Sequence, residues 1–260
     1  MIRIDCRGAP SDDLAKSAPI QEAYDCFVKH GYAILDHVVP DAKLQALRAE
    51  FDEQYPQYLR DAETADSIEV GKRRYMVPIA LSGAFADPQV FANPWVVALI
   101  REVLGRDAIL EAFGAVVSLA GSQAQHVHTD GPPLFSAEIS SVLPAHALTF
   151  ALPLIEMNEL HGTTAMWPGS HRSRVHKDGV PPMLPTIPVG SCLIWDFRLY
   201  HSGTENRSTR HRPMLYATYA RRWYQDPVNF RKEAQRRLVF DPGFIDGLPE
   251  DTRMLVSHLR

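Results

Sequence analysis

In the first 108 residues, apolar positions recur every three to four residues in several segments, which is the period of one helix face. The predicted helices span residues 20–30, 41–60 and 93–104. A short apolar run at residues 32–35 predicts an early strand. Residues 62–88 are interrupted by glycine and proline, so we expect a loop there that can form a lid, with one strand at residues 74–77.

After residue 108 the pattern changes to that of β-strands. Short runs rich in apolar and β-branched residues are separated by Gly, Pro, Ser and Asn. These runs span residues 109–120, 147–155, 163–167, 190–197 and 213–222. Helices followed by many strands predict an α+β chain whose core is a sandwich or barrel. We expect one domain over residues 1–260, divided into a mainly helical support and lid (1–108), the core (109–222) and a helical C-terminal tail (223–260).

The composition is that of an ordinary globular protein, with 45% hydrophobic and 22% charged residues. The net charge of −4 comes from interspersed acidic and basic residues, so neither nucleic acid nor a membrane surface is an expected partner. Without a secretory signal or an apolar run long enough to span a bilayer, the sequence predicts a cytoplasmic protein, as monomer or homodimer. Three scattered cysteines argue against a disulfide framework and a Cys-type zinc site.

Candidate metal ligands lie in residues 124–130. On an extended strand, residues i and i+2 point to the same side, so His128 and Asp130 would present an imidazole and a carboxylate together. His201, 73 residues further on, can complete the set. Two histidines and one carboxylate leave three positions open on Fe(II), as in non-haem oxygenases, but they also bind zinc. The histidines that we expect in turns, with structural or solvated roles, are His146, His171 and His176.

Arg212 stands eleven residues after His201, at the start of a predicted strand. Its guanidinium is always charged and forked, so beside an iron site it suits the bidentate binding of a dicarboxylate cosubstrate. A zinc or manganese hydrolase or isomerase on a similar barrel would give Arg212 no role. This residue therefore favours the oxygenase interpretation.

Several motifs occur in a specific order between about Tyr24 and Tyr219. They are Gly31-Tyr32, Gly121-Ser122, Gln125, His128-Thr129-Asp130, Pro168-Gly169-Ser170-His171-Arg172, Gly190-Ser191, Trp195-Asp196, His201, Asn206-Arg207-Ser208 and Arg212. Each motif alone is common, but the order and spacing together resemble the phytanoyl-CoA dioxygenase-like branch of the Fe(II)/2-oxoglutarate oxygenases.

The resemblance implies a double-stranded β-helix (a jelly-roll, or cupin-like barrel) flanked by N-terminal helices. It implies that His128, Asp130 and His201 bind the iron and that Arg212 binds the far carboxylate of 2-oxoglutarate. Gln125 and His126 are further candidates for cosubstrate binding. On an ideal strand they face opposite ways, so we expect only one of them in the cavity unless a bulge intervenes.

Some positions depart from the family pattern or have an ordinary structural explanation. Two residues after the second histidine, the family commonly has a small hydroxyl side chain that helps to hold the cosubstrate, whereas this chain has Gly203. Arg73 and Arg74 are candidates for an anionic ligand, but exposed paired arginines are usually solvated, and we expect that here. We expect Trp167, Trp195 and Phe197 in the core rather than as a platform for substrate.

Together these observations predict a non-haem Fe(II)/2-oxoglutarate-dependent dioxygenase that hydroxylates an aliphatic C–H bond of a small molecule in specialised metabolism. It would consume O2 and release succinate and CO2. Asp130 favours oxygenation over halogenation, because related halogenases have Gly or Ala there and leave room for chloride. The alternatives are the zinc or manganese hydrolase or isomerase and a non-catalytic binding relative.

Overall fold

The computed structural model describes residues 2–8, 14–173 and 179–259, so His176 lies outside the described residues. The strands are β1 Ile4–Asp5, β2 Tyr32–Asp36, β3 Ile68–Gly71, β4 Arg74–Pro78, β5 Ala80–Leu81, β6 Ile109–Ser118, β7 Ala147–Pro153, β8 Thr164–Met166, β9 Cys192–Asp196, β10 His201–Gly203, β11 Arg212–Ala220 and β12 Val239–Phe240. The α-helices are α1 Ala18–His30, α2 Asp41–Gln54, α3 Pro88–Phe91, α4 Pro94–Leu104, α5 Ala137–Ser140, α6 Phe244–Gly247 and α7 Glu250–Arg253. Segments of 3-10 helix are Leu14–Lys16, Pro56–Leu59, Gly83–Ala86, Ser170–Arg172 and Met254–Leu259.

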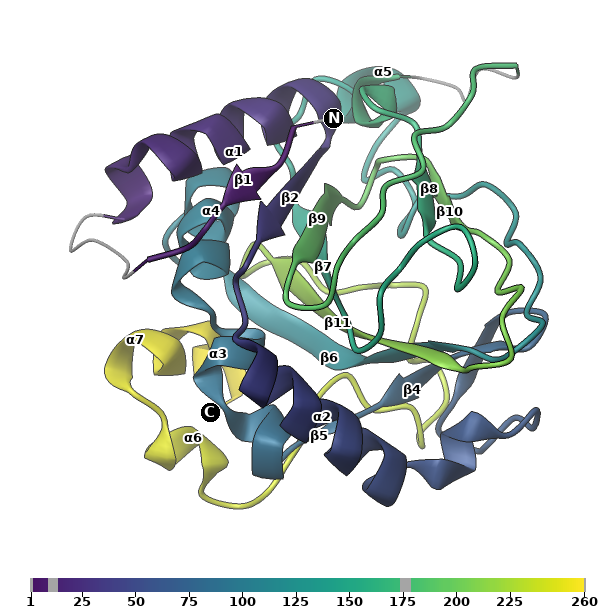
Figure 1. Cartoon of the computed structure of the whole chain (residues 1–260). Helices are drawn as coiled ribbons and strands as arrows, with labels where there is room; N and C mark the ends of the chain where they lie inside the picture. Colours follow the sequence, from purple (N-terminus) through teal and green to yellow (C-terminus); the bar gives the residue numbers. More distant parts are fainter. Residues whose placement is uncertain (1, 9–13, 174–178, 260) are drawn as a thin grey trace.

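One large sheet dominates the fold, with the strand order β1-β2-β9-β7-β11-β6-β4-β3. Its neighbouring strands are antiparallel except for β1 and β2. A short antiparallel sheet of β8 and β10 lies opposite, and the N-terminal helices lie on the other side of the large sheet (Figure 1). This arrangement confirms the predicted jelly-roll with N-terminal helices. The region before residue 108 also contributes β1 to β4 to the large sheet.

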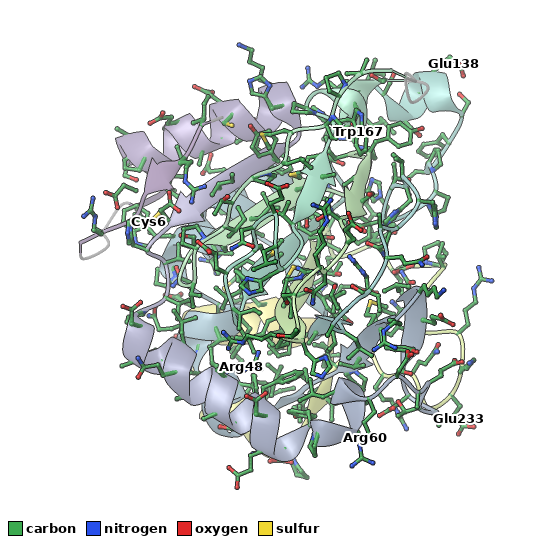
Figure 2. The ribbon with its side chains drawn as sticks, turned by 45° about the vertical axis from the view of Figure 1, so that its right-hand side comes forward. Cys6, Arg48, Arg60, Glu138, Trp167 and Glu233 are labelled. Carbon is green, nitrogen blue, oxygen red and sulfur yellow. The ribbon has the colours of Figure 1, made fainter. Side chains whose placement is uncertain are left out.

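The large sheet is buried on both faces, and alternate residues of each strand belong to different cores. In β9, Cys192 and Ile194 pack with the helices, whereas Leu193 and Trp195 pack toward β8. Strands buried on both sides carry nearly continuous apolar runs rather than alternating ones, which explains the sequence pattern. Side chains project from both faces of the large sheet into the neighbouring layers (Figure 2).

The predicted helix over residues 41–60 is shorter in the structure. Helix α2 ends at Gln54, and Tyr55 leaves the helical region with φ −122° and ψ 38°. Pro56 is the reason, because a proline ring disfavours helical geometry at the residue before it. Among the described residues, no helix combines the length and the apolar composition needed to cross a bilayer.

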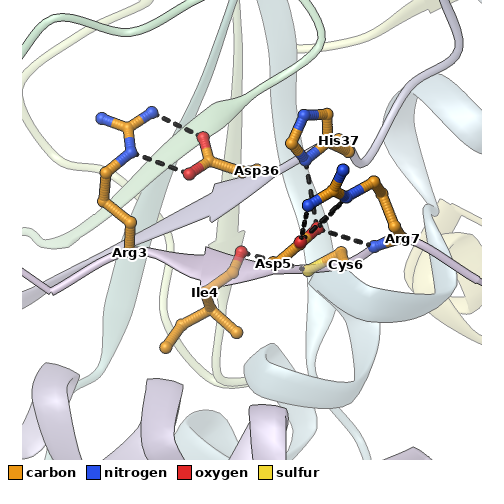
Figure 3. A network of polar contacts seen from close by, with 7 residues as sticks. All are labelled: Arg3, Ile4, Asp5, Cys6, Arg7, Asp36 and His37. Atoms are coloured by element: carbon orange, nitrogen blue, oxygen red, sulfur yellow. Dashed lines mark hydrogen bonds and ion pairs between the residues drawn. The ribbon is translucent and has the colours of Figure 1, made fainter.

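Ion pairs attach the N-terminal strand to the edge of the sheet (Figure 3). Arg3 donates from Nε to Asp36 at 2.7 Å and from Nη2 at 2.5 Å, a two-point contact across the β1–β2 pair. Asp5 accepts from Arg7 and lies 3.1 Å from His37 Nδ1. None of these residues lines the large cavity described below, and their contacts hold β1 in place.

Candidate functional site

A cavity of about 600 Å³ lies between the large sheet and the short sheet. One face of the large sheet supplies its floor, because strand residues two apart point the same way. In β11 these residues are Arg212, Met214, Tyr216 and Thr218. Neighbouring strands add Arg74, Met76, Val116, Thr149 and Trp195. The irregular segment from Gln125 to Asp130 and the strand β10 supply the opposite wall.

His128, Asp130 and His201 meet inside this cavity. One nitrogen or oxygen atom of each lies within 4.8 Å of the others, close enough for a single metal ion to be bound by all three. Their meeting depends on the backbone. His128 and His201 form an antiparallel bridge, with N–O distances of 3.0 Å and 2.9 Å in the two directions. The structure therefore brings together the three residues that the sequence analysis selected.

Each imidazole is held by its Nδ1 atom. In His128 this atom lies 2.8 Å from the carbonyl oxygen of His126, and in His201 it lies 2.9 Å from that of Leu199. A carbonyl can only accept, so both Nδ1 atoms carry a proton, and in the neutral ring the lone pair lies on Nε2. This is the tautomer that a metal ligand needs, with the ring orientation already fixed.

The carboxylate of Asp130 is oriented by two donors. The Thr149 hydroxyl and the Trp195 indole N–H both donate to Oδ2 at 2.7 Å. Oδ1 faces His201, 3.3 Å from its Nε2. One oxygen is thus occupied by the protein, while the other points toward the two imidazoles.

The electrostatics suit a cation between these groups. Burial opposes ionisation of Asp130, but His201 and the hydrogen bonds lower its pKa overall. Burial followed by repulsion from His201 lowers the pKa of His128, which favours the neutral ring. Burial also disfavours charge on His201, yet Asp130 raises the pKa of His201 overall. A metal ion bound between Asp130 and His201 would take the place of the proton that Asp130 favours on Nε2 of His201.

Arg212 lies deep in the same cavity, 2% exposed. Its Nη2 donates to the Ser118 hydroxyl at 2.6 Å, and its Nε has no hydrogen-bond partner. Burial, then repulsion from Arg74, lowers the pKa of Arg212 to about 9, which still leaves it charged at neutral pH. Among the described residues, no carboxylate pairs with it. A buried, unpaired guanidinium is a strong indication of a bound anion.

Gln125 and His126 both line the cavity, so the expectation of a single inward-facing residue on an ideal strand is wrong. The segment is irregular up to the bridge at His128 and does not keep the two-residue alternation. Gln125 accepts from the Gly203 amide at 2.9 Å and donates to the Val70 carbonyl at 2.5 Å. His126 is exposed at the rim, its ring centroid 5.2 Å from that of His128.

The two adjacent arginines have different surroundings. Arg73 fits the expectation, because it is partly exposed and pairs with Asp61 at 2.7 Å outside the cavity. For Arg74 the expectation of a solvated side chain is wrong, since it is 1% exposed and lines the cavity. The cause is the β3–β4 hairpin, which points Arg74 into the sheet interior where the sequence predicted a lid loop with one strand.

Sequence reasoning missed several residues of the site. Trp195 and Phe197 are buried as expected, but both also line the cavity, and Trp195 contacts Asp130. The sequence signal for this was their two-residue spacing on and after β9, which places both side chains on one face of the sheet. The segment from Asp226 to Phe230 closes one side of the cavity. No pattern in the tail indicated this. His146 and His171 are buried outside the cavity, in agreement with structural roles.

The fold and these side chains define a class: a jelly-roll protein with two histidines and one carboxylate gathered inside the barrel. The chain belongs to the phytanoyl-CoA dioxygenase (PhyH) family, whose model matches residues 27–214. Solved structures agree with this fold. HygX from Streptomyces hygroscopicus, solved with nickel, 2-oxoglutarate and hygromycin B bound, has a TM-score of 0.63 at 14% identity, covering 85% of this chain and 97% of HygX.

Two further structures are similar. The non-haem α-ketoglutarate-dependent epimerase SnoN from nogalamycin biosynthesis has a TM-score of 0.57 at 18% identity, covering 78% of this chain and 81% of SnoN. EvdMO1 has a TM-score of 0.60 at 18% identity over 78% of this chain. This chain spans 50% of the length of EvdMO1. At these identities the likenesses establish the fold.

Proposed function

We propose that this protein is an Fe(II)- and 2-oxoglutarate-dependent oxygenase acting on a small molecule. The observation that carries the proposal is one cavity that contains both the His128, Asp130 and His201 cluster and the unpaired guanidinium of Arg212. Family membership supports the same reaction class. A zinc hydrolase would use the cluster but would leave the buried charge of Arg212 without a purpose.

In this proposal His128 and His201 bind Fe(II) through Nε2, and Asp130 binds it through Oδ1. The hydrogen bonds to the opposite side of each ligand fit this assignment, because they leave those atoms free. Arg212 binds the far carboxylate of 2-oxoglutarate. Iron with 2-oxoglutarate and O2 supplies the oxidising power, with succinate and CO2 as by-products.

The protein's own task is to hold the substrate and limit water. Trp195, Phe197 and Tyr216 form apolar parts of the wall around the cluster. A cavity of about 600 Å³ has room for 2-oxoglutarate and for part of a second small molecule. Fixing the target carbon beside the reactive centre contributes much of the rate and prevents oxidation of the protein itself.

We propose hydroxylation of an aliphatic C–H bond in specialised metabolism as the reaction. HygX was solved with hygromycin B bound, and SnoN is an epimerase from nogalamycin biosynthesis. Similar folds therefore occur in proteins that bind complex natural products or take part in their biosynthesis. Epimerisation starts from the same hydrogen abstraction and is the alternative outcome. The monomer or homodimer state, the cytoplasmic location and the use of residues 1–260 as one domain stay predictions.

The test begins with cosubstrate binding under anaerobic conditions. Protein loaded with Fe(II) should gain visible charge-transfer absorption when 2-oxoglutarate is added, and should form succinate when O2 is admitted. A chelator should abolish both signals. Protein loaded with Zn(II) should form no succinate. The proposal fails if the Fe(II) protein neither binds 2-oxoglutarate nor consumes it.

Ligand variants sharpen this test. His128→Ala, Asp130→Ala and His201→Ala should each lose metal binding, because two remaining ligands hold a ferrous ion poorly. His161→Ala is the matched control, since His161 lies in a loop and does not line the cavity. Metal content after gel filtration separates the variants. Normal iron content in all three ligand variants would refute the assignment.

A further inference from the structure

Arg74 and Arg212 occupy one row across three strands of the large sheet. Arg74 on β4 and Arg212 on β11 are both paired in register with Ser118 of β6. Side chains directly opposite on neighbouring strands share a face, so both guanidiniums enter the cavity from the same side. Both side chains are at most 2% exposed.

Arg74 retains unused hydrogen-bonding capacity. Its Nη2 donates to the carbonyls of Thr204 at 2.6 Å and Gln123 at 3.2 Å. Its Nη1 makes a long contact of 3.4 Å with Gln125 Oε1, and its Nε has no partner. Among the described residues no carboxylate pairs with Arg74. Two buried like charges in one cavity, neither of them paired with a carboxylate, favour the binding of an anion between them.

Gly203 explains how Arg74 reaches this place. A Cβ atom on residue 203 would stand 1.6 Å from Nη1 and 2.8 Å from Cζ of Arg74. Any side chain at position 203 would therefore displace the guanidinium. Gly203 lies two residues after His201, on the strand that carries this proposed ligand. The guanidinium of Arg74 thus fills the space where a side chain of residue 203 would otherwise face the cavity.

We propose that Arg74 is a second anchor for the far carboxylate of 2-oxoglutarate, taking the position that Gly203 leaves empty. The inference rests on the proposed function and adds a residue to its cosubstrate site. Arg212 and Arg74 would then both donate hydrogen bonds to the same carboxylate. The excess positive charge favours a dicarboxylate over a 2-oxo acid that has a single carboxylate.

The experiment compares two ligands on protein loaded with Ni(II), which prevents turnover. 2-Oxoglutarate and 2-oxopentanoate have the same chain length, but only the first has a far carboxylate. Arg74→Gln should weaken 2-oxoglutarate binding by about 10- to 100-fold, the range for a charge-assisted hydrogen bond, and should leave 2-oxopentanoate binding and nickel content unchanged. Arg73→Gln, the neighbouring residue outside the cavity, should change neither affinity.

The outcomes distinguish a direct contact between Arg74 and the far carboxylate from a purely structural role of Arg74. Arg74 also holds two loop carbonyls, so a purely structural role would weaken both ligands equally, and that result would overturn the inference. Unchanged 2-oxoglutarate affinity in a folded Arg74→Gln variant would also overturn it. If the wild type itself fails to bind 2-oxoglutarate, the fault lies with the proposed function rather than with the role of Arg74.

A second pair of variants keeps the test decisive if Arg74→Gln folds poorly. Gly203→Ser alone should reduce 2-oxoglutarate affinity, because the new side chain collides with Arg74. In the Arg74→Gln background the same change should restore part of the affinity, since the collision with the guanidinium is gone, only Gln125 Oε1 at 2.6 Å from the added Cβ must still shift, and a hydroxyl can donate to the carboxylate. Gly203→Ser that lowers affinity equally in both backgrounds would contradict the proposed exchange of roles.

Discussion

The indole N–H of Trp195 donates to Oδ2 of Asp130 over 2.7 Å. The same indole ring lies 5.2 Å from the His201 ring, so one side chain contacts two members of the cluster. Trp195 comes from β9 in the middle of the large sheet and is 4% exposed. Its position is therefore set by the core, and the carboxylate is oriented by a part of the molecule that does not move easily.

Replacing this donor should weaken metal binding. Trp195→Phe keeps an aromatic ring but leaves Oδ2 of Asp130 with Thr149 alone, and we expect about 10-fold weaker nickel affinity, as for other residues that orient metal ligands. Calorimetric titration measures this. Trp167→Phe is the matched control, because that indole donates to the Val180 carbonyl instead. Equal affinity in Trp195→Phe and wild type would show that the hydrogen bond does not tune the carboxylate.

Arg212 should affect the cosubstrate and leave the metal in place. Arg212→Ala removes the guanidinium near Ser118, and we expect 2-oxoglutarate binding to weaken by about 1.5–3 kcal/mol or more, the range for charge-assisted hydrogen bonds. Nickel content should match the wild type. Arg212→Lys should bind with intermediate affinity, since it keeps the charge and loses the fork. Wild-type affinity in Arg212→Ala would remove this residue from the site.

Stability should fall with acid through His146. Burial lowers the pKa of this histidine to about 4, from an ordinary value of 6.5. Below pH 6.5 His146 therefore binds a proton in the unfolded chain but stays neutral in the folded protein. The free energy of unfolding declines from pH 6.5 to about pH 4, by up to about 3 kcal/mol. His146→Phe fits beside the Phe197 and Tyr224 rings and should flatten this decline.

Urea unfolding at pH 7.5 and pH 5 measures the effect, with chelator present so that loss of metal does not contribute. The free energy of unfolding should fall more between pH 7.5 and pH 5 in the wild type than in His146→Phe. The variant therefore gains stability relative to the wild type at pH 5. Parallel stability curves for the two proteins would show that His146 titrates normally.

Gly31 should tolerate alanine poorly. Gly31 ends α1 with φ 82°, and a Cβ there would lie 2.6 Å from Nδ1 of His171 and 2.8 Å from Cδ1 of Leu199. Gly169 has the same φ of 82° but no atom within 4 Å of an added Cβ. Gly169→Ala should therefore cost about 1 kcal/mol of unfolding free energy from the backbone alone, and Gly31→Ala roughly 2–4 kcal/mol with the collision added. Equal thermal shifts for both variants would show that the neighbours of Gly31 adjust freely.

Local patterns in the sequence predicted most of the fold. Strands β6, β7, β9 and β11 lie within or close to their predicted ranges, because apolar runs and flanking glycine or proline act over a few residues. Pro56, also a local signal, ends helix α2 before the predicted boundary at residue 60. Motif order and spacing were sufficient to select His128, Asp130, His201 and Arg212.

Tertiary structure decided the remaining contacts. Whether Arg74 is solvated or buried depends on the β3–β4 hairpin and on the absence of a side chain at Gly203, 129 residues away. The hydrogen bond from Trp195 to Asp130 likewise joins residues 65 apart. The sequence by itself determined which chemical groups this protein has and which strands carry them. Only the packing of the two sheets decided which of these groups face one another, because side-chain contacts across a barrel depend on strand register and not on neighbours along the chain.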